Sequence, residues 1–231
     1  MTGLFPMTSL ELHPVRHVIP AGTELWRVHN VRYAPHLFNP KLADPFEFKD
    51  GNRFDGTRLD PYHCLYLGDT PTTALAESVL RSRPFELPAG KRRIPYATVA
   101  GRCLSVLRTR CDLVLVSLIE AKDLAAVCQE STLLEDERNY VSARRWASEI
   151  RAQAPDVAGL IWQSRHNRPQ RALVLFHDRF DGCGGRPLEV VAGAGIARLD
   201  SDAGIDLANR YLEPLRAEIS RPLRGDAGDR T

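Results

Sequence analysis

Residues 64–81 read CLYLGDTPTTALAESVLR, and this stretch predicts a strand that leads directly into a helix. In Cys64–Gly68 two leucines alternate with the cysteine and the tyrosine, so the leucines occupy one face of a strand and the other two side chains the opposite face. Thr70 is of a residue type that caps helix N-termini, and Pro71 suits the first helical position because its missing N–H would be unpaired there anyway. A helix from Pro71 to about Arg81 is therefore predicted.

The predicted helix has an apolar side and a polar side. Leu75 and Val79 are four residues apart, so they share the side that packs inward. Glu77 lies on a different side, near Thr73 and Arg81. Its carboxylate is therefore presented away from the apolar packing surface of the helix.

The rest of the chain mixes strands and helices without a regular strand–helix–strand alternation. Strands are predicted at Thr23–Asn30, Cys64–Gly68, Tyr96–Val106, Leu113–Ile119, Gly159–Ser164, Ala172–Phe176, Glu189–Ala192 and Ile196–Leu199, and further helices at Asn139–Gln153 and Asp202–Ile219. Asn30–Pro61 is rich in Pro, Asn, Asp and aromatic residues and is predicted to form long loops. This pattern favours a single α+β domain in which helices flank a mixed, largely antiparallel sheet.

The composition excludes several classes of protein. The chain has 231 residues, of which 43% are hydrophobic and 26% charged, as in an ordinary globular domain. Its net charge of +2 argues against a dedicated nucleic-acid binder, because such proteins usually carry a clear basic excess. No apolar run approaches the roughly 18 residues of a membrane-spanning helix, and the N-terminus lacks the features of a signal peptide. We therefore expect no membrane partner and no direct nucleic-acid binding.

The five cysteines are odd in number, and no pair has Cys-x-x-Cys spacing. A disulfide framework is therefore not expected, and the cytoplasm is the expected compartment. Cys183, in a glycine-rich run, is interpreted as part of a flexible turn. His63 and His166 lack partners at metal-ligand spacing, and Gly193–Gly195 lacks the third glycine and the following helix of a dinucleotide fingerprint. The sequence thus predicts no metal and no permanent cofactor.

Five scattered residues remain as candidates for chemistry, namely Arg27, Arg53, Tyr66, Glu77 and Ser164. Each of them also has a purely structural interpretation. Arg27 can be an exposed strand residue, Tyr66 a core residue and Ser164 the end of a strand. Glu77 can pair with the arginine four residues later, and Arg53 with a neighbouring aspartate. Spacing alone does not decide between the two interpretations.

The segments that carry these residues resemble the RES domain, a family named for its Arg, Glu and Ser. The resemblance rests on Leu25–Val28, Arg53–Gly56, Leu65–Glu77, Gly159–Arg165 and Ala172–Phe176, which occur in the family's order. The segment that ends in Glu77, together with the one that contains Ser164, makes the resemblance fairly specific. Asn52 stands where the family commonly has a glycine before the arginine.

The resemblance implies a fold related to the ADP-ribosyltransferase toxins. It also implies a bacterial toxin that consumes NAD as its substrate and is neutralised by a protein antitoxin, which we expect to cover the pocket. By the same resemblance, the family's functional positions correspond to Arg27, Arg53, Tyr66, Glu77 and Ser164.

The domain boundaries follow from the extent of the resemblance. The expected organisation is an N-terminal tail over residues 1–13, a catalytic domain over 14–198, a C-terminal helix packed on the domain over 199–220 and a disordered tail over 221–231.

Cleavage of the nicotinamide–ribose bond makes chemical sense of these residue types. The reaction passes through an oxocarbenium-like state, and Glu77 can hold a ribose hydroxyl and stabilise the positive charge. Arg27 and Arg53 suit the pyrophosphate or an attacking phosphate, because a guanidinium offers paired donors. Tyr66 can stack on nicotinamide, and Ser164 can hydrogen-bond the adjoining ribose. Arg27, Glu77 and Ser164 are the expected catalytic residues.

Three functions remain open at this point. The first is an NAD-degrading toxin whose acceptor is inorganic phosphate, as a co-substrate, or water. The second is an ADP-ribosyltransferase that modifies a protein or a nucleic acid. The third is a non-catalytic binding module on the same fold, against which the complete set of Arg, Tyr, Glu and Ser counts.

Overall fold

The computed structural model describes residues 10–136, 140–180 and 183–222. The strands of its large sheet are β1 Arg16–Ile19, β2 Glu24–Asn30, β3 Cys64–Gly68, β5 Arg102–Thr109, β6 Leu113–Leu118, β7 Gly159–Gln163, β8 Arg171–Phe176 and β9 Leu188–Val190. A second, two-stranded sheet consists of β4 Arg92–Ile94 and β10 Ala217–Ile219. The helices are α1 Pro71–Val79, α2 Tyr96–Val99, α3 Ala121–Ala126, α4 Thr132–Glu135, α5 Tyr140–Gln153 and α6 Asp202–Leu212.

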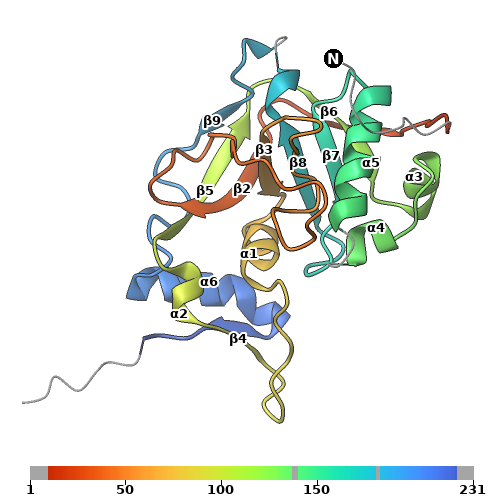
Figure 1. Cartoon of the computed structure of the whole chain (residues 1–231). Coiled ribbons are helices and arrows are strands. Elements are labelled where there is room, and N and C mark those ends of the chain that lie inside the picture. The colour runs from red at the N-terminus through yellow and green to blue at the C-terminus, as the bar shows by residue number, and fades with distance from the viewer. Residues whose placement is uncertain (1–9, 137–139, 181–182, 223–231) are drawn as a thin grey trace, which may run out of the picture.

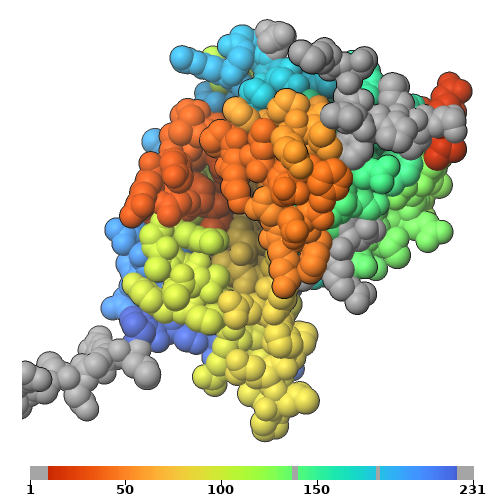
Figure 2. Space-filling model, viewed as in Figure 1, coloured from red at the N-terminus to blue at the C-terminus, as the bar shows by residue number. Residues whose placement is uncertain are grey.

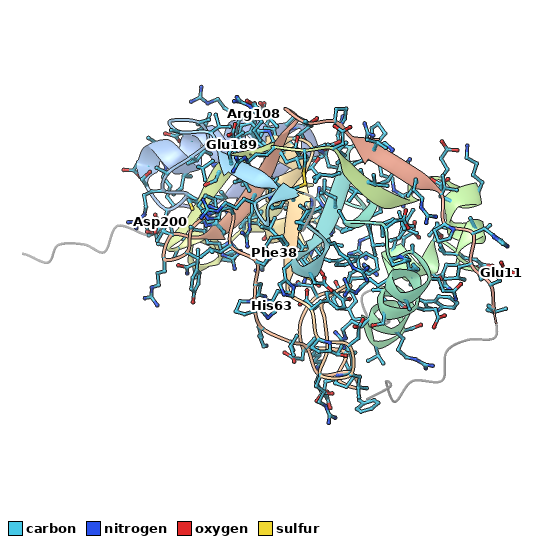
Figure 3. The ribbon with its side chains drawn as sticks, turned by 90° about the horizontal axis from the view of Figure 1, so that it is seen from above. Glu11, Phe38, His63, Arg108, Glu189 and Asp200 are labelled. Carbon is cyan, nitrogen blue, oxygen red and sulfur yellow. A yellow bond between two sulfur atoms is a disulfide. The ribbon has the colours of Figure 1, made fainter. Side chains whose placement is uncertain are left out.

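The large sheet has the strand order β1-β6-β7-β8-β3-β2-β5-β9 (Figure 1). Its neighbouring strands are antiparallel, except that β6 and β7 are parallel. At the β9 edge, Arg108 of β5 pairs with Glu189 of β9 across 3.5 Å (Figure 3). The predicted α+β domain with a mixed, largely antiparallel sheet is therefore confirmed.

The sheet curls into a half-barrel, since only residues 110–112 separate β5, near one end of the strand order, from β6, near the other end. Ile19 and Leu115 from one end pack in the same cluster as Leu107 and Leu188 from the other. The opposite face is covered by helices in two places. Helix α5 packs on β6, β7 and β8, whereas α1 and α6 pack on the β2–β5 side (Figure 1). Figure 2 shows the segment between α1 and β4 projecting from this body.

Helix α1 begins as the sequence predicts. The Thr70 side chain accepts a hydrogen bond from the backbone N–H of Thr73 at 3.1 Å, and Pro71 occupies the first turn. Leu75 and Val79 are buried, and Glu77 is half-buried on another side of the helix. The strand–helix unit that positions Glu77 is therefore correctly predicted.

Two predicted elements are wrong in their extent. The strand predicted over Tyr96–Val106 is divided, because Tyr96–Val99 forms α2 and Gly101, at φ +66°, turns the chain into β5. The helix predicted over Asp202–Ile219 ends at Leu212, since Pro214 has no N–H to continue it. Glu213–Leu215 form a 3₁₀ turn, and Ala217–Ile219 form β10, which pairs with β4.

Two further predictions change near the ends of the domain, and one strand is added. The N-terminal tail is shorter than predicted, because Leu12 is buried in the core and the His13 N–H donates to the Ala126 oxygen. The strand β1 was not predicted, and the strand predicted over Ile196–Leu199 is reduced to an isolated bridge at Ile196. The predicted disordered tail falls on residues 221–231, of which 223–231 lie outside the described residues.

The expectation of no disulfide framework needs a correction, because two of the five cysteines are cross-linked. Cys111 and Cys183 form a disulfide across 72 residues of sequence, with a Cα–Cα distance of 6.2 Å. The pairing of β5 with β9 brings the turn after β5 close to the segment before β9, which spacing in the sequence does not reveal. Cys183 is thus part of a cross-link rather than of a flexible turn.

Across the described ranges, no helix combines the length and the apolar character that spanning a membrane requires.

Candidate active site

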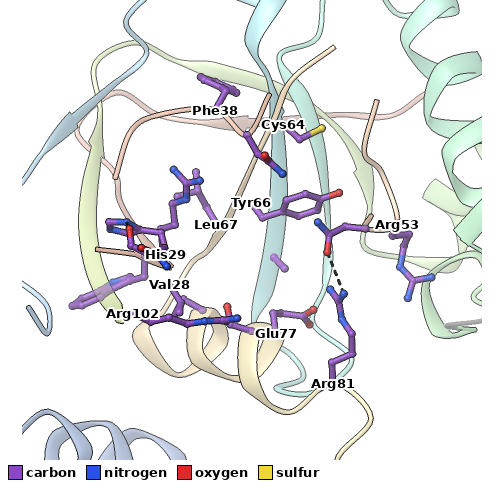
Figure 4. Close-up of a pocket in the computed structure, with 18 of the residues that line it drawn as sticks. Val28, His29, Phe38, Arg53, Cys64, Tyr66, Leu67, Glu77, Arg81 and Arg102 are labelled. Atoms are coloured by element: carbon purple, nitrogen blue, oxygen red, sulfur yellow. Dashed lines mark hydrogen bonds between the residues drawn. The ribbon is translucent and has the colours of Figure 1, made fainter. Parts of the chain in front are cut away.

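The candidate site is a cavity of about 1040 Å³ between β2 and β3 (Figure 4). These strands share one residue pair, Trp26 with Gly68, whereas β2 makes seven pairs with β5. Beyond that pair the ladder stops, and Val28 and Tyr66 line the cavity together with Glu77 from α1. The volume lies at the upper end of the range of about 300–1,000 Å³ that is usual for small-molecule sites. The cavity therefore has room for a large ligand.

Glu77 and Ser164 meet at this cavity although they are 87 residues apart in sequence. The Ser164 hydroxyl donates to Glu77 Oε1 at 2.6 Å. The serine side chain is 0% exposed and lies behind the carboxylate, outside the set of residues that line the cavity. The structural alternative, a pair between Glu77 and Arg81, is not formed, because Arg81 donates to Asn52 at 3.1 Å. Ser164 thus orients the Glu77 side chain through one of the two carboxylate oxygens.

Asn167 fastens the turn that carries Ser164 to helix α1. Its backbone N–H donates to Ser164 Oγ at 3.1 Å, and its side-chain Nδ2 donates to Thr73 Oγ1 at 3.0 Å. Thr73 lies one turn before Glu77 on the same helix. Asn167 is therefore a positioning residue for the Glu77–Ser164 pair. The sequence analysis missed it, because 94 residues separate it from Thr73 and no motif marks it.

Tyr66 presents its ring, rather than its hydroxyl, to the cavity. The hydroxyl donates to Asp55 Oδ1 at 2.9 Å and accepts from the Phe54 N–H at 3.1 Å. Burial, followed by the buried Asp55 carboxylate, raises the pKa of Tyr66 well above its ordinary value, so the phenol stays protonated. Because the hydroxyl is already occupied, the ring face remains for contact with a ligand. The predicted stacking role fits this geometry and stays a prediction.

Arg27 joins the cavity to the start of the long loop. Its Nη1 donates to the Pro35 oxygen at 2.5 Å and to the Leu37 oxygen at 2.7 Å, while the side chain lines the cavity. Burial lowers the pKa of Arg27 to about 10, so the guanidinium remains positively charged at neutral pH. A guanidinium has five N–H donors, and those not directed at the loop can serve an anion.

Arg53 is fixed by α4 and α5 rather than by a neighbouring aspartate. Its Nη1 donates to the Leu133 oxygen at 2.6 Å, and its guanidinium lies 4.9 Å from the centre of the Tyr140 ring. Asp55, the nearest candidate partner in sequence, bonds Asn52 and Tyr66 instead. Burial is the main cause that lowers the pKa of Arg53 from its ordinary value. Arg53 therefore holds the loop against the helices at the edge of the cavity.

The cavity is strongly basic although the chain as a whole carries a net charge of only +2. Among the described residues that line it, six are lysines or arginines and one, Glu77, is acidic. The basic residues are Arg27, Lys41, Arg53, Arg81, Arg102 and Arg165. Figure 4 shows Arg53 and Arg81 on one side of Glu77 and Arg102 on the other. This local excess of positive charge favours an anionic ligand.

Four of the six basic residues were missed by the sequence analysis. Lys41, Arg81, Arg102 and Arg165 come from four separate segments of the chain, and the sequence analysis assigned none of them a role in binding, so only folding brings them together. Among residues 10–136, 140–180 and 183–222, no group of three or more His, Cys, Asp or Glu side chains is arranged to hold a metal ion.

A comparison with protein families finds a match over most of the chain. The model of the RES domain matches residues 24–189. The chain belongs to the RES-domain family. The matched range lies within the predicted catalytic domain, residues 14–198, and contains all five residues that the resemblance singled out. In this RES domain four of them line the cavity, and Ser164 supports Glu77 from behind.

The RES domain also has a similar solved structure. A chain in the crystal structure of the M. tuberculosis MbcT–MbcA toxin–antitoxin complex is 14% identical and superposes with a TM-score of 0.51. The match covers 86% of this chain and 91% of that one, and at this level of identity it shows a shared fold. No curated protein gives a significant match.

Proposed function

We propose that this RES-domain protein cleaves the nicotinamide–ribose bond of NAD and transfers the ADP-ribosyl group to inorganic phosphate. The observation that supports this is an oriented carboxylate in a cavity with six basic side chains. The substrate carries two phosphates, which suit the basic side chains, and its ribose gains positive charge as the bond breaks, which suits Glu77. One cavity thus offers complementary charge to both parts of the substrate.

The atoms and electrons of the proposed reaction balance without an added acid. The C1–N bond breaks, and its electron pair goes to the pyridinium nitrogen, so nicotinamide leaves as a neutral molecule. A phosphate oxygen then forms the new C1–O bond and gives ADP-ribose-1″-phosphate. Glu77 stabilises the oxocarbenium-like state. Ser164 acts through Glu77 rather than on the ribose, because its hydroxyl is buried.

The two predicted arginines take different anions in this proposal. Arg27, on β2, binds the pyrophosphate, and Arg53, on the long loop, holds the acceptor phosphate near the anomeric carbon. A bound and oriented acceptor can lower a barrier by several kcal/mol. Water as the acceptor gains nothing from an additional cation, so Arg53 favours phosphate over hydrolysis.

A single incubation separates these acceptors. Purified protein is mixed with NAD, with and without millimolar phosphate, and the products are identified by mass. We expect faster loss of NAD with phosphate and a phosphorylated ADP-ribose, and Arg53→Ala should remove the phosphate dependence. Equal rates and plain ADP-ribose would show hydrolysis instead. A second incubation, with labelled NAD and a cell lysate, tests the ADP-ribosyltransferase, because label on a macromolecule would show that activity. Unconsumed NAD in both incubations would indicate a binding module.

We also propose that the protein is the toxin of a toxin–antitoxin pair. The solved structure that shares its fold belongs to such a complex, and uncontrolled loss of NAD harms any cell. The open cavity needs a partner that covers Arg27 and Glu77. Expression without neighbouring genes should therefore arrest bacterial growth, and Glu77→Gln should relieve the arrest. Normal growth with unchanged cellular NAD, despite folded protein, would contradict the toxin proposal.

A further inference from the structure

Asn52 connects a buried carboxylate to a charged side chain at the cavity. Its Nδ2 donates to Asp55 Oδ2 at 3.1 Å, and its Oδ1 accepts from Arg81 Nη1 at 3.1 Å. Asp55, 3% exposed, is itself fixed by the Asn52 backbone N–H at 2.8 Å and by the Tyr66 hydroxyl at 2.9 Å. A carboxylate only accepts hydrogen bonds, so the amide must turn its NH₂ toward Asp55 and its oxygen toward Arg81. The orientation of the amide is thus set from inside the protein.

Arg81 occupies a position where a pair with Glu77 would be expected. It is four residues after Glu77, just beyond the C-terminal end of α1, and it is exposed. A glutamate followed by an arginine at this spacing commonly forms an ion pair. Here the guanidinium is held by Asn52 and lies 5.8 Å from the centre of the Tyr140 ring. Figure 4 shows the Arg81 side chain directed along its dashed hydrogen bond rather than at the Glu77 carboxylate.

We propose that Asn52 is a positioning residue that presents Arg81 to phosphate groups in the cavity and keeps it from neutralising Glu77. The identity of the substrate rests on the proposed function, whereas the inference that the cavity binds phosphate groups does not. Two sources offer the same chemistry, namely the diphosphate of a nucleotide and free inorganic phosphate. ADP and inorganic phosphate are therefore separate probes.

The binding test uses a double-mutant cycle. Asn52→Ala removes the amide and keeps the backbone N–H to Asp55, and Arg81→Met keeps an unbranched apolar stem beside Tyr140. Each change should weaken calorimetric binding of at least one probe about five-fold, the upper end of what an exposed ion contact contributes. The double variant should bind no more weakly than Arg81→Met alone, because both changes remove the same contact. The probe that responds identifies the source of the phosphate.

A matched control and a kinetic readout separate positioning from general loss of structure. Arg83→Met removes an arginine that bonds Thr98 outside the cavity, and it should leave binding unchanged. With NAD, Asn52→Ala should lower kcat, because the freed Arg81 pairs with Glu77. Adding Arg81→Met to that variant should raise kcat to the value of Arg81→Met alone, which a merely loosened loop would not do.

The outcomes distinguish this inference from the proposed function. Unchanged binding of both probes in either single variant, or additive losses in the double variant, would overturn the role of Asn52. No recovery of kcat in the double variant would overturn the claim that Asn52 keeps Arg81 from Glu77. Coupled loss of binding in a protein that leaves NAD intact would support the anion-binding role and contradict the proposed function.

Discussion

At the scale of single residues, the site depends on how the Glu77 carboxylate is held. Glu77 receives the Ser164 hydroxyl, and Ser164 in turn receives the Asn167 N–H. Ser164 is fully buried, and a buried side chain in a close-packed environment keeps one rotamer. The carboxylate is therefore held in one orientation, which in the proposed reaction would preorganise it for the charge that develops on the substrate.

Glu77→Gln should abolish turnover and leave the fold intact. The change keeps the size of the side chain and removes the negative charge, and electrostatic groups of this kind typically contribute about 10²–10³ in rate. The effect is measured as the rate at which nicotinamide is released from NAD, and circular dichroism checks the fold. Wild-type turnover by this variant would remove Glu77 from the mechanism.

Ser164→Ala should lower kcat more than it changes KM, because the buried hydroxyl orients Glu77 without touching the ligand. Ser117→Ala is a matched control. Ser117 is also buried and donates to a buried carboxylate, Asp123 in α3, at 2.5 Å, but it lies outside the cavity. The control should lose stability and keep kcat. Equal kinetic losses in both variants would show that Ser164 acts only through stability.

At the scale of secondary-structure elements, the close packing of α1 on β3 places Glu77 beside Tyr66. Gly68 ends β3, and a Cβ there would lie 2.6 Å from the backbone nitrogen of Ala74 in α1. Glycine is therefore required for this approach. The Thr70 cap then begins the helix within two residues of the strand.

Thr70→Ala should destabilise the protein by about 1 kcal/mol, because the N–H of Thr73 loses its capping oxygen. For a chain of this size the melting temperature should fall by roughly 2–4 °C. Thr70→Ser keeps the capping oxygen and should retain most of the stability. A melting temperature equal to wild type in Thr70→Ala would show that the cap contributes nothing to α1.

At the scale of the whole molecule, histidines make the fold sensitive to mild acid. Burial is the largest cause that lowers the pKa of His17, His29 and His177 from 6.5. His177 Nδ1 also accepts the His63 backbone N–H at 3.0 Å, which requires that nitrogen to be unprotonated. These groups hold protons less tightly in the folded chain than in the unfolded chain.

Stability should therefore fall as the pH drops through about 6.5, because the unfolded chain takes up protons first. The loss continues until the pH reaches the lowered pKa values of the folded chain. Asp156 and Asp178, whose pKa values are also lowered, add to the loss only nearer the ordinary aspartate value of 3.8. Melting temperatures between pH 7.5 and pH 5 measure the effect, and His177→Asn should make the slope shallower. A melting temperature that rises toward pH 5 would contradict the sign.

Local sequence patterns were sufficient for the elements that depend on neighbours along the chain. Alternation predicted β3, and the Thr70-Pro71 pair predicted the start of α1, because capping and side-chain periodicity are set within a few residues. The family resemblance, carried by linear segments, singled out five candidate residues, of which four line the cavity and the fifth, Ser164, contacts Glu77. Elements with weak local signals, such as β1 and β4, were missed, since their strands are stabilised by partners far along the chain.

Only the tertiary structure decided how these parts meet. The early end of the β2–β3 ladder, which opens the cavity, is a matter of strand register, and the same alternating pattern is compatible with several registers. No spacing rule relates the residues that meet in the Ser164–Glu77 contact, the Asn52–Arg81 contact or the Cys111–Cys183 disulfide, and none predicts the burial of Ser164. The sequence by itself determined which residues and local elements are available. Long-range packing determined which of them face one another, because contacts between distant segments leave no periodic trace in the chain.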